Sequence, residues 1–480
     1  MSALRIAILS SEAVPFAKVG GLADVSGALT KALHSQAVDS LLIIPFYDQI
    51  DRALVDDEFI NDLEVIWRGQ ERRISVYRSA TLKAPAYLID APHYFARGSV
   101  YGATDDFERF AFFCRAAIAL LKKFDRAPDV VHCNDWPCGF APIELRARRK
   151  HEEFFADTRS LFSIHNMAYH GAFDPENLRW LDFSNYADDF MLSGAASALK
   201  AGLVAADALS TVSPRYAREI QTPEQGYGLD WLMRARSDRL AGITNGVDYE
   251  VWNPKNDPHI AAPFDADDLS GKQKCKLDLL RRFGLPEEPA RPIIAIISRL
   301  VAQKGYDLIR QGASAILDTG AFFIALGAGA REYEDFLQGW HDRAPHRVGI
   351  YKGFAGEALA HQIEAGADIF LMPSLYEPCG LNQMYSMRYG TIPVVRATGG
   401  LDDTVDNFDP NTGKGDGFKF SPYSAAAMLE KIREALYFYS EPKTWRGIQR
   451  NAMKRDNSWS ITAKKYIRLY EEIIELPRIF

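Results

Sequence analysis

Residues 4–29, "LRIAILSSEAVPFAKVGGLADVSGAL", contain the pattern that decides the fold of this chain. A short apolar run at 4–9 precedes a loop with two adjacent glycines, and apolar residues at helical spacing follow the loop. Such a run, bounded by a glycine-containing loop and an amphipathic stretch, is typical of a buried strand that leads into a covering helix. The stretch therefore predicts one strand, loop and helix of an α/β domain.

The same alternation continues through the rest of the sequence. In the first half, the apolar runs are residues 4–9, 40–46, 85–90, 129–135, 160–165 and 208–213. In the second half, they are residues 292–300, 321–329, 347–354, 368–374 and 391–398. Strands that are apolar throughout belong to parallel sheets with helices on both faces. We therefore expect an α/β fold with two doubly wound, Rossmann-like domains that face a deep cleft.

The sequence between the two halves changes in character. Residues 244–271 lose periodicity and become rich in Pro, Asn and Asp, which is typical of a linker. We therefore expect an N-terminal domain at 1–245, an interdomain linker at 246–271 and a C-terminal domain at 272–457. The last segment, 458–480, has apolar residues at helical spacing and no following strand, so we expect a helix that packs back towards the N-terminal domain.

The composition excludes several classes of protein. At 480 residues, of which 47% are hydrophobic, the chain is long enough for two or three domains. The formal net charge of −7 argues against sequence-independent binding of nucleic acid, and no apolar run approaches the roughly 20 residues of a membrane-spanning helix. The five cysteines lack C-x-x-C spacing, so they predict neither a disulfide framework nor a structural zinc site. We expect a cytoplasmic protein with no nucleic-acid or membrane partner.

Polar residues, together with glycines and one tryptophan, follow many of the expected strands, at the ends where the ligands of parallel sheets bind. In the first half, these residues are Lys18, Gly20, Gly21, Asp135, Trp136, His165 and Asn166. In the second half, they are Arg299, Lys304, Glu377, Cys379, Gly380, Asp403 and Thr404. Arg299 and Lys304 flank a helix start, where two cations and free N–H groups suit a diphosphate. Each residue alone also fits a structural role, so it is their joint occurrence at strand ends that indicates a site.

Several motifs of the chain resemble those of one enzyme family. The motifs are KVGGLADV (18–25), HCNDW (132–136), HNMAYHGAF (165–173), residues 199–230, ITNGVD (243–248), SRLVAQKG (298–305) and the block 377–405. In this order they resemble the bacterial glycogen synthases and plant starch synthases of glycosyltransferase family 5. The resemblance covers essentially the whole chain, and the block from Glu377 to Val405 is its most specific part.

The resemblance implies a fold and a reaction. In the GT-B arrangement of this family, the nucleotide sugar lies mainly on the C-terminal domain and the glucan on the N-terminal domain. The implied reaction moves glucose from ADP-glucose to the non-reducing 4-OH of an α-1,4-glucan, such as glycogen, starch or a maltooligosaccharide, with retention at the anomeric carbon. No metal or other cofactor is implied, because ADP-glucose is a substrate.

The resemblance also assigns residues to roles. The implied catalytic residues are Lys18, His165, Arg299, Lys304 and Glu377. The implied donor contacts are Lys18, Gly20, Gly21, Asn245, Arg299, Lys304, Phe354, Glu377, Cys379, Gly380, Leu381, Thr398, Gly399, Gly400 and Thr404. The implied acceptor contacts are Glu12, Asp135, Trp136 and Asn166. Cations are needed because negative charge develops on the departing diphosphate. Phe354 is expected to be the ring that stacks on adenine.

Two positions bear on which branch of the wider clan the chain resembles, and alternatives stay open. Tyr385 stands eight residues after Glu377, where many retaining enzymes of the wider clan carry a second glutamate, and this favours the glycogen and starch synthase branch. Leu375 replaces an arginine that usually precedes the acidic dipeptide. The alternatives are a relative that uses UDP-glucose and a catalytically silent partner that binds α-glucan. A plastid location is expected only if a transit peptide has been removed.

Overall fold

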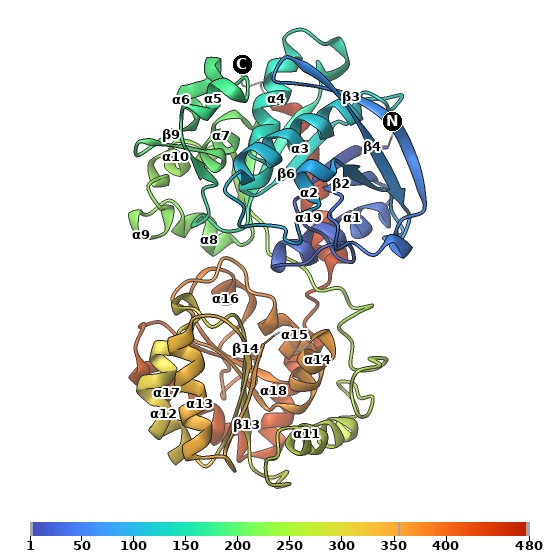
Figure 1. The fold of residues 1–480 in the computed structure, drawn as a ribbon. Helices are drawn as coiled ribbons and strands as arrows, with labels where there is room; N and C mark the ends of the chain where they lie inside the picture. The colour runs from blue at the N-terminus through green and yellow to red at the C-terminus, as the bar shows by residue number, and fades with distance from the viewer. Residues whose placement is uncertain (1–2, 354–355, 477–480) are drawn as a thin grey trace. The chain divides into compact units, whose positions relative to one another are not determined.

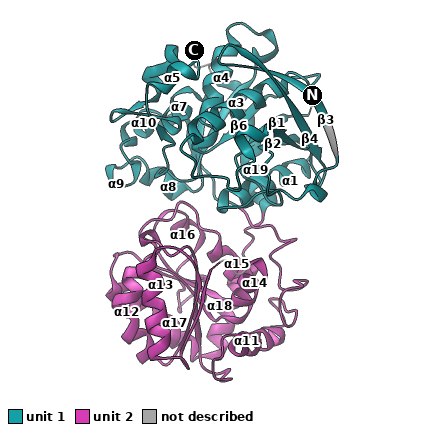
Figure 2. Cartoon of the chain, in the orientation of Figure 1, with its two compact units in different colours: residues 1–245, 459–480 teal, residues 246–458 magenta. Residues whose placement is uncertain are grey.

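A computed structural model describes residues 3–353 and 356–476 (Figure 1). The chain forms two compact units (Figure 2). Unit 1 comprises Met1–Asn245 and Trp459–Phe480, and unit 2 comprises Gly246–Ser458. Unit 2 is therefore inserted into the sequence of unit 1, and the chain passes between the units after Asn245 and again after Ser458.

The core of unit 1 is a mixed sheet, which has nine strands in the described part of the chain. Across the sheet, the strands are β12 (Leu240–Gly242), β11 (Ala208–Thr211), β7 (Arg159–Ile164), β6 (Val130–Asn134), β1 (Arg5–Leu9), β2 (Asp39–Pro45), β5 (Ala86–Asp90), β4 (Gln70–Ser79) and β3 (Asp57–Trp67). From β12 to β5 all neighbours are parallel. The hairpin of β3 and β4 adds antiparallel strands at one edge. The six apolar runs expected as strands are confirmed, whereas the hairpin was not expected.

Helices pack on this sheet because their apolar residues recur at helical spacing. In α1 (Gly21–His34), for example, Leu22, Val25, Leu29 and Leu33 are all buried. The other helices of unit 1 are α2 (Pro92–Phe95), α3 (Asp106–Leu121), α4 (Phe140–Arg149), α5 (Asn177–Trp180), α6 (Ala187–Phe190), α7 (Ala198–Ala205), α8 (Pro214–Glu219), α9 (Pro223–Gly226), α10 (Asp230–Ala235) and α19 (Trp459–Glu475). A small antiparallel sheet has the strand order β8 (Ala172–Phe173), β10 (Ala195–Ser197) and β9 (Met191–Leu192).

Helix α19 belongs to unit 1 although it follows unit 2 in the sequence. It packs against α1 and contacts β6 and β7. Tyr470 of α19 is fully buried, and its hydroxyl lies 2.8 Å from Nδ1 of His132, which is also fully buried. The other ring nitrogen of His132 lies 2.5 Å from Ser163 Oγ. A polar contact inside the core thus ties the end of the chain to two central strands.

Unit 2 is built on a sheet that has six strands, all parallel, among the described residues. Their order is β15 (Val348–Lys352), β14 (Phe322–Gly327), β13 (Ile293–Ile297), β16 (Ile369–Met372), β17 (Ile392–Arg396) and β18 (Phe418–Phe420). The helices are α11 (Ser270–Arg282), α12 (Tyr306–Asp318), α13 (Arg331–Arg343), α14 (Gly356–Gly366), α15 (Asn382–Arg388), α16 (Gly399–Thr404), α17 (Ala425–Tyr439) and α18 (Pro442–Lys454). Five of the six strands had been expected from their apolar runs.

The segment 246–271, which was expected to link two domains, belongs to unit 2. Trp252 lies between the rings of His361 and Tyr385, with ring centroids 3.9 Å apart on both sides. Asp257 Oδ2 accepts hydrogen bonds from His361 Nδ1 at 2.7 Å and from the Tyr389 hydroxyl at 2.5 Å. Because a buried indole and a buried carboxylate anchor it, the segment is an ordered part of this unit and not a free connection.

Candidate active site

The expected site residues lie at the carboxyl ends of parallel strands in both units. In unit 1, β1 pairs with β2 on one side and with β6 on the other. In unit 2, β13 pairs with β14 and with β16. Ligands of such sheets bind where the strand order reverses in this way. Lys18 follows β1 and Asp135 follows β6, while Lys304 follows β13 and Glu377 follows β16.

Lys304 and Glu377 are in direct contact in unit 2. Lys304 Nζ lies 2.6 Å from Glu377 Oε2, and Ser374 Oγ donates a hydrogen bond to the same oxygen at 3.1 Å. Only 17% of the Lys304 side chain and 8% of the Glu377 side chain are exposed. Burial of a carboxylate is costly without partners, and the lysine and the serine offset that cost. The pair places a cation and an acid side by side at the strand-order reversal.

Glycines let the backbone close tightly around this pair. Gly305 has φ 76°, and a Cβ there would lie 2.2 Å from the carbonyl oxygen of Pro373. Gly399 has φ 43°, and a Cβ there would lie 1.9 Å from the carbonyl oxygen of Glu377. Gly400 N–H donates to the same Glu377 carbonyl at 3.1 Å. A side chain at Gly305 would therefore push the loop after β13 away from Pro373, and one at Gly399 would push the loop after β17 away from Glu377.

The remaining donor residues expected in unit 2 lie in the same loops. Cys379, Gly380 and Leu381 connect Glu377 to α15, Thr398 precedes α16, and Thr404 ends α16. The Cys379 thiol is buried and not in a disulfide. Gln383, which the sequence did not single out, is fully buried behind this loop and donates to two of its carbonyls.

Arg299 and Phe354 complete the set expected in unit 2. Arg299 is an exposed residue in the loop directly after β13, five positions before Lys304. Both cations therefore lie in the segment that follows β13. Phe354, the expected adenine-stacking ring, lies outside the described residues.

In unit 1, Glu12 holds the Lys18 loop in place. Its Oε2 accepts hydrogen bonds from the N–H groups of Val19 at 2.6 Å and Gly20 at 2.9 Å. Its Oε1 accepts one from the Tyr101 hydroxyl at 3.0 Å. Burial raises the pKa of Glu12, although these three hydrogen bonds act in the opposite direction. Sequence reasoning assigned Glu12 to the acceptor; in the structure its contacts shape the loop that ends where Gly21 begins α1.

Asp135 combines an unusual backbone with a shifted carboxyl group. Its φ of 59° and ψ of 179° fall in a region that residues other than glycine rarely adopt. The side chain accepts a hydrogen bond from the His165 N–H at 3.4 Å. Burial nevertheless raises the pKa of Asp135 to about 7, and the nearby Glu12 carboxylate adds to the shift. Strain and a perturbed pKa at one residue are typical of functional sites.

His165 is held as a neutral ring. Its Nε2 lies 2.9 Å from Asn134 Oδ1, and Asn134 Nδ2 donates to the Leu9 carbonyl at 3.1 Å. Because the amide oxygen accepts, Nε2 carries the proton and Nδ1 is the acceptor. Desolvation lowers the pKa of His165 to about 4. The ring therefore acts at neutral pH as a dipole and not as a cation, and Asn134 is a contributor that sequence reasoning missed.

Three further predicted residues lie in unit 1. The Trp136 ring lies so close to Gly171, which has φ 57°, that a Cβ there would come within 2.2 Å of it. Asn166 Oδ1 accepts from the Ala168 N–H at 3.0 Å and shapes the loop after β7. Asn245, 6% exposed, keeps a buried Oδ1 for which the described residues provide no hydrogen-bond partner.

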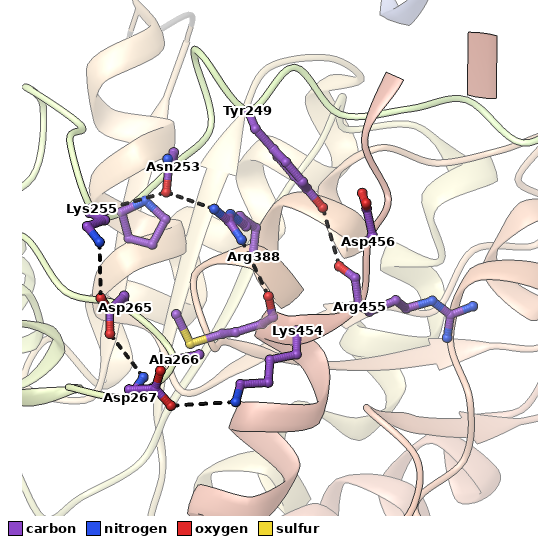
Figure 3. A pocket seen from close by; sticks show the side chains of 12 residues that line it. Tyr249, Asn253, Lys255, Asp265, Ala266, Asp267, Arg388, Lys454, Arg455 and Asp456 are labelled. Carbon is purple, nitrogen blue, oxygen red and sulfur yellow. Dashed lines mark hydrogen bonds and ion pairs between the residues drawn. The ribbon is translucent and has the colours of Figure 1, made fainter. Parts of the chain in front are cut away.

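A pocket of about 410 Å³ lies elsewhere in unit 2 (Figure 3). The residues that line it include Tyr249, Arg388 and Arg455, and none of the predicted site residues is among them. Its charged side chains pair with neighbours; Lys454 Nζ, for example, lies 3.5 Å from Asp267 Oδ1. This pocket is therefore separate from the strand-end site.

Two negative findings apply to the described residues, 3–353 and 356–476. In these ranges, no three His, Cys, Asp or Glu side chains are grouped closely enough to hold a metal ion. The same ranges contain no helix with the length and apolar character needed to cross a membrane.

Two family models and several named glycogen synthases match this chain. Residues 5–235 match the starch synthase catalytic domain family, and residues 280–453 match the glycosyl transferases group 1 family. The glycogen synthase of Koribacter versatilis is 44% identical over 98% of this chain and 98% of its own length. The glycogen synthase of Geobacillus stearothermophilus is 42% identical, with the same coverage of both chains.

Solved structures agree with this family. The catalytic domain of starch synthase IV from Arabidopsis thaliana, bound to ADP and acarbose, is 32% identical and has a TM-score of 0.91, over 99% of this chain and 100% of that one. A sucrose-phosphate synthase from Thermosynechococcus elongatus, at 19% identity and a TM-score of 0.63 over 98% of this chain and 99% of that one, supports the fold alone. The chain therefore belongs to the glycogen and starch synthase family of GT-B glucosyltransferases.

Proposed function

We propose that this chain elongates an α-1,4-glucan by transferring glucose from ADP-glucose to the non-reducing 4-OH, with retention at the anomeric carbon. The relatives that support this are named glycogen synthases, and the solved relative is bound to ADP and acarbose. The observation that carries the proposal is the contact of Lys304 with Glu377 at the strand-order reversal of unit 2.

The charges of unit 2 suit the donor. When ADP leaves, negative charge grows on its distal phosphate, and preorganised cations stabilise that charge most strongly where water is excluded. We assign this role to Arg299 and Lys304. In the described structure the contacts of the Glu377 carboxylate occupy Oε2, so we assign the hydroxyls of the donor glucose to Oε1.

The contacts of Glu377 also favour one route to retention. Retaining hydrolases use two carboxyl groups about 5 Å apart, one of which is the nucleophile. Among the described residues, the partners of the Glu377 carboxylate are Lys304 and Ser374 and not a second acid. Tyr385, at the position of the second glutamate of the wider clan, stacks on Trp252. We therefore propose a front-face reaction, in which a phosphate oxygen of the leaving ADP takes the proton of the attacking 4-OH.

We assign the glucan to unit 1. The Trp136 ring, which is partly exposed, offers a face for a glucose ring, and Asp135 follows the same strand. We assign to His165 the stabilisation of positive charge on the donor sugar, either through the dipole of its neutral ring or through its backbone carbonyl. We propose that the reaction needs no metal. We also propose a cytoplasmic location, because all five cysteines are free thiols.

Labelled donors test the proposal directly. The protein is incubated with glycogen and either labelled ADP-glucose or labelled UDP-glucose, with and without EDTA, and label is counted in the precipitated polymer. We expect incorporation from ADP-glucose that EDTA does not change. Incorporation from UDP-glucose alone would overturn the donor assignment. No incorporation from either donor, with glycogen binding retained, would identify the protein as a glucan-binding partner.

A further inference from the structure

Gln383 lies in the first turn of α15, directly behind the loop that follows Glu377, and it is fully buried. Its Nε2 donates to the carbonyl oxygens of Cys379 and Gly380, each at 3.1 Å. The same Nε2 lies 2.9 Å from Thr404 Oγ1. The two hydrogens of this amide nitrogen are shared among the three oxygens, so one amide group contacts two successive carbonyls of the loop and a second helix.

The orientation of these carbonyls fixes the orientation of two N–H groups. The Cys379 carbonyl shares a planar peptide unit with the Gly380 N–H, and the Gly380 carbonyl shares one with the Leu381 N–H. In a trans peptide the N–H points opposite to the carbonyl. By holding both carbonyls, Gln383 therefore directs both N–H groups away from itself. Neither N–H has a hydrogen-bond partner among the described residues.

Thr404 extends this connection back to Glu377. Thr404 Oγ1 donates to the Gly400 carbonyl at 2.5 Å, so it receives the Gln383 hydrogen bond through its lone pairs. Gly400 N–H in turn donates to the Glu377 carbonyl at 3.1 Å. The segment from Glu377 to Gln383 is thus tied to helix α16 at both of its ends, at the Glu377 carbonyl and at the Gln383 side chain.

We propose that Gln383 is a positioning residue for glucosyl transfer, which acts by aiming the N–H groups of Gly380 and Leu381 at the sugar and diphosphate of the donor. Pairs of successive N–H groups that point the same way bind anionic and hydroxyl oxygens. The inference rests on the proposed function, because the donor defines what these groups bind. Gln383 itself touches only the protein.

The first test replaces Gln383 with methionine, which keeps the length of the side chain and removes the donor. The two peptide units lose the bonds that fix them, and misplacement of donor contacts by about 1 Å costs on the order of 100-fold in rate. We expect kcat/KM for ADP-glucose to fall about 100-fold and the Kd of ADP to rise about tenfold, while KM for glycogen stays within about twofold. Rates and ADP calorimetry on the full chain measure these values.

Gln449 provides a matched control. It is also a buried glutamine of unit 2, 7% exposed, and its Nε2 donates to the Gly390 carbonyl at 2.8 Å. Gln449→Met therefore removes the same kind of bond away from the donor loop. We expect it to lower the melting temperature as Gln383→Met does, while kcat/KM and the Kd of ADP stay within about twofold of wild type.

A second variant, Thr404→Val, tests the proposal if Gln383→Met does not fold. Thr404→Val leaves the Gln383 bonds to both loop carbonyls and removes the tie to Gly400. We expect a loss of kcat/KM for ADP-glucose of about tenfold, again without a change in KM for glycogen. Unchanged kinetics per folded molecule in both variants would overturn the role of Gln383. If wild-type protein transfers glucose from neither donor, it is the proposed function that fails, and the comparison of ADP affinities still tests the loop.

Discussion

Lys18 Nζ lies 2.8 Å from Asp24 Oδ1, so the cation of the glycine loop is held over the first turn of α1. The Lys18 side chain is 45% exposed and the Asp24 side chain 23% exposed. An ion pair this open adds little to the stability of the fold. Lys18 belongs to unit 1, whereas Lys304 and Glu377 belong to unit 2.

Lys18→Ala should separate turnover from nucleotide binding. Because the cations assigned to the diphosphate are in unit 2, we expect the Kd of ADP to change less than about twofold, while kcat falls at least about tenfold. The melting temperature should hardly change. Asp24→Asn, which keeps the lysine, is the control and should affect kcat much less. Equal losses in kcat and in ADP affinity would show that Lys18 binds the nucleotide without a special role in turnover.

Arg299→Ala should remove a charge that stabilises the leaving group. We expect kcat/KM for ADP-glucose to fall on the order of 100-fold, since each preorganised group of this kind contributes several kcal/mol. Folding should be unaffected, because Arg299 is an exposed residue. Arg331→Ala removes another exposed arginine of unit 2, with a side chain 91% exposed, and should leave kinetics unchanged. Near-normal turnover of Arg299→Ala would remove Arg299 from the site.

Asp135 should make the stability of unit 1 depend on pH. Burial raises its pKa from 3.8 to about 7 in the folded protein. Between these values the folded state holds a proton that the unfolded chain has lost, so stability falls as pH rises through this range, by on the order of 1 kcal/mol per pH unit. The loss is complete above pH 7. The side chain introduced by Asp135→Asn cannot ionise, so this variant should not lose stability in this pH range.

Thermal melts at pH 5 and pH 8 measure this effect. We expect the melting temperature of Asp135→Asn relative to wild type to be a few degrees higher at pH 8 than at pH 5. Comparing the two proteins at each pH cancels the titration of other groups such as His165. The same relative stability at both values would mean that Asp135 ionises as it does in the unfolded chain.

Gly399→Ala should damage both stability and activity. With φ 43° and only 1.9 Å between the new Cβ and the Glu377 carbonyl oxygen, we expect a loss of about 3 kcal/mol and a fall in kcat/KM. Gly447→Ala is the control, because nothing lies within 4 Å of a Cβ at this position in α18. It should raise stability by up to about 1 kcal/mol and leave kinetics unchanged. A stable, active Gly399→Ala protein would argue against the close approach.

The parallel sheets could be predicted because their strands are buried on both faces. Every residue of β16 is buried, for example, and its sequence IFLM is an apolar run. The hairpin of β3 and β4 has no such run, since most of β4 is exposed or half-buried and carries charges. The segment 246–271 has the composition of a linker, but single residues such as Trp252 anchor it, and composition does not report such contacts.

In the candidate site, too, many of the residues could be predicted from the sequence but their contacts could not. Lys304 and Glu377 could be identified from their motifs, but their contact joins residues 73 positions apart and follows only from the adjacent strands β13 and β16. Glu12 was expected at the acceptor, whereas its hydrogen bonds hold the Lys18 loop. The sequence does not reveal the role of Gln383, because this role depends on which carbonyl groups its side-chain amide contacts in the fold.

The place of α19 in the chain has a consequence for synthesis on the ribosome. Domains generally fold as units while the chain emerges. Unit 1 begins first, but the ring of His132 gains its contact with Tyr470 only when α19 emerges, after all of unit 2. Unit 2 is complete in sequence before that point. The unit that is synthesised first is therefore completed last. During translation its two central strands, β6 and β7, lack their contacts with α19 until the end of the chain has emerged.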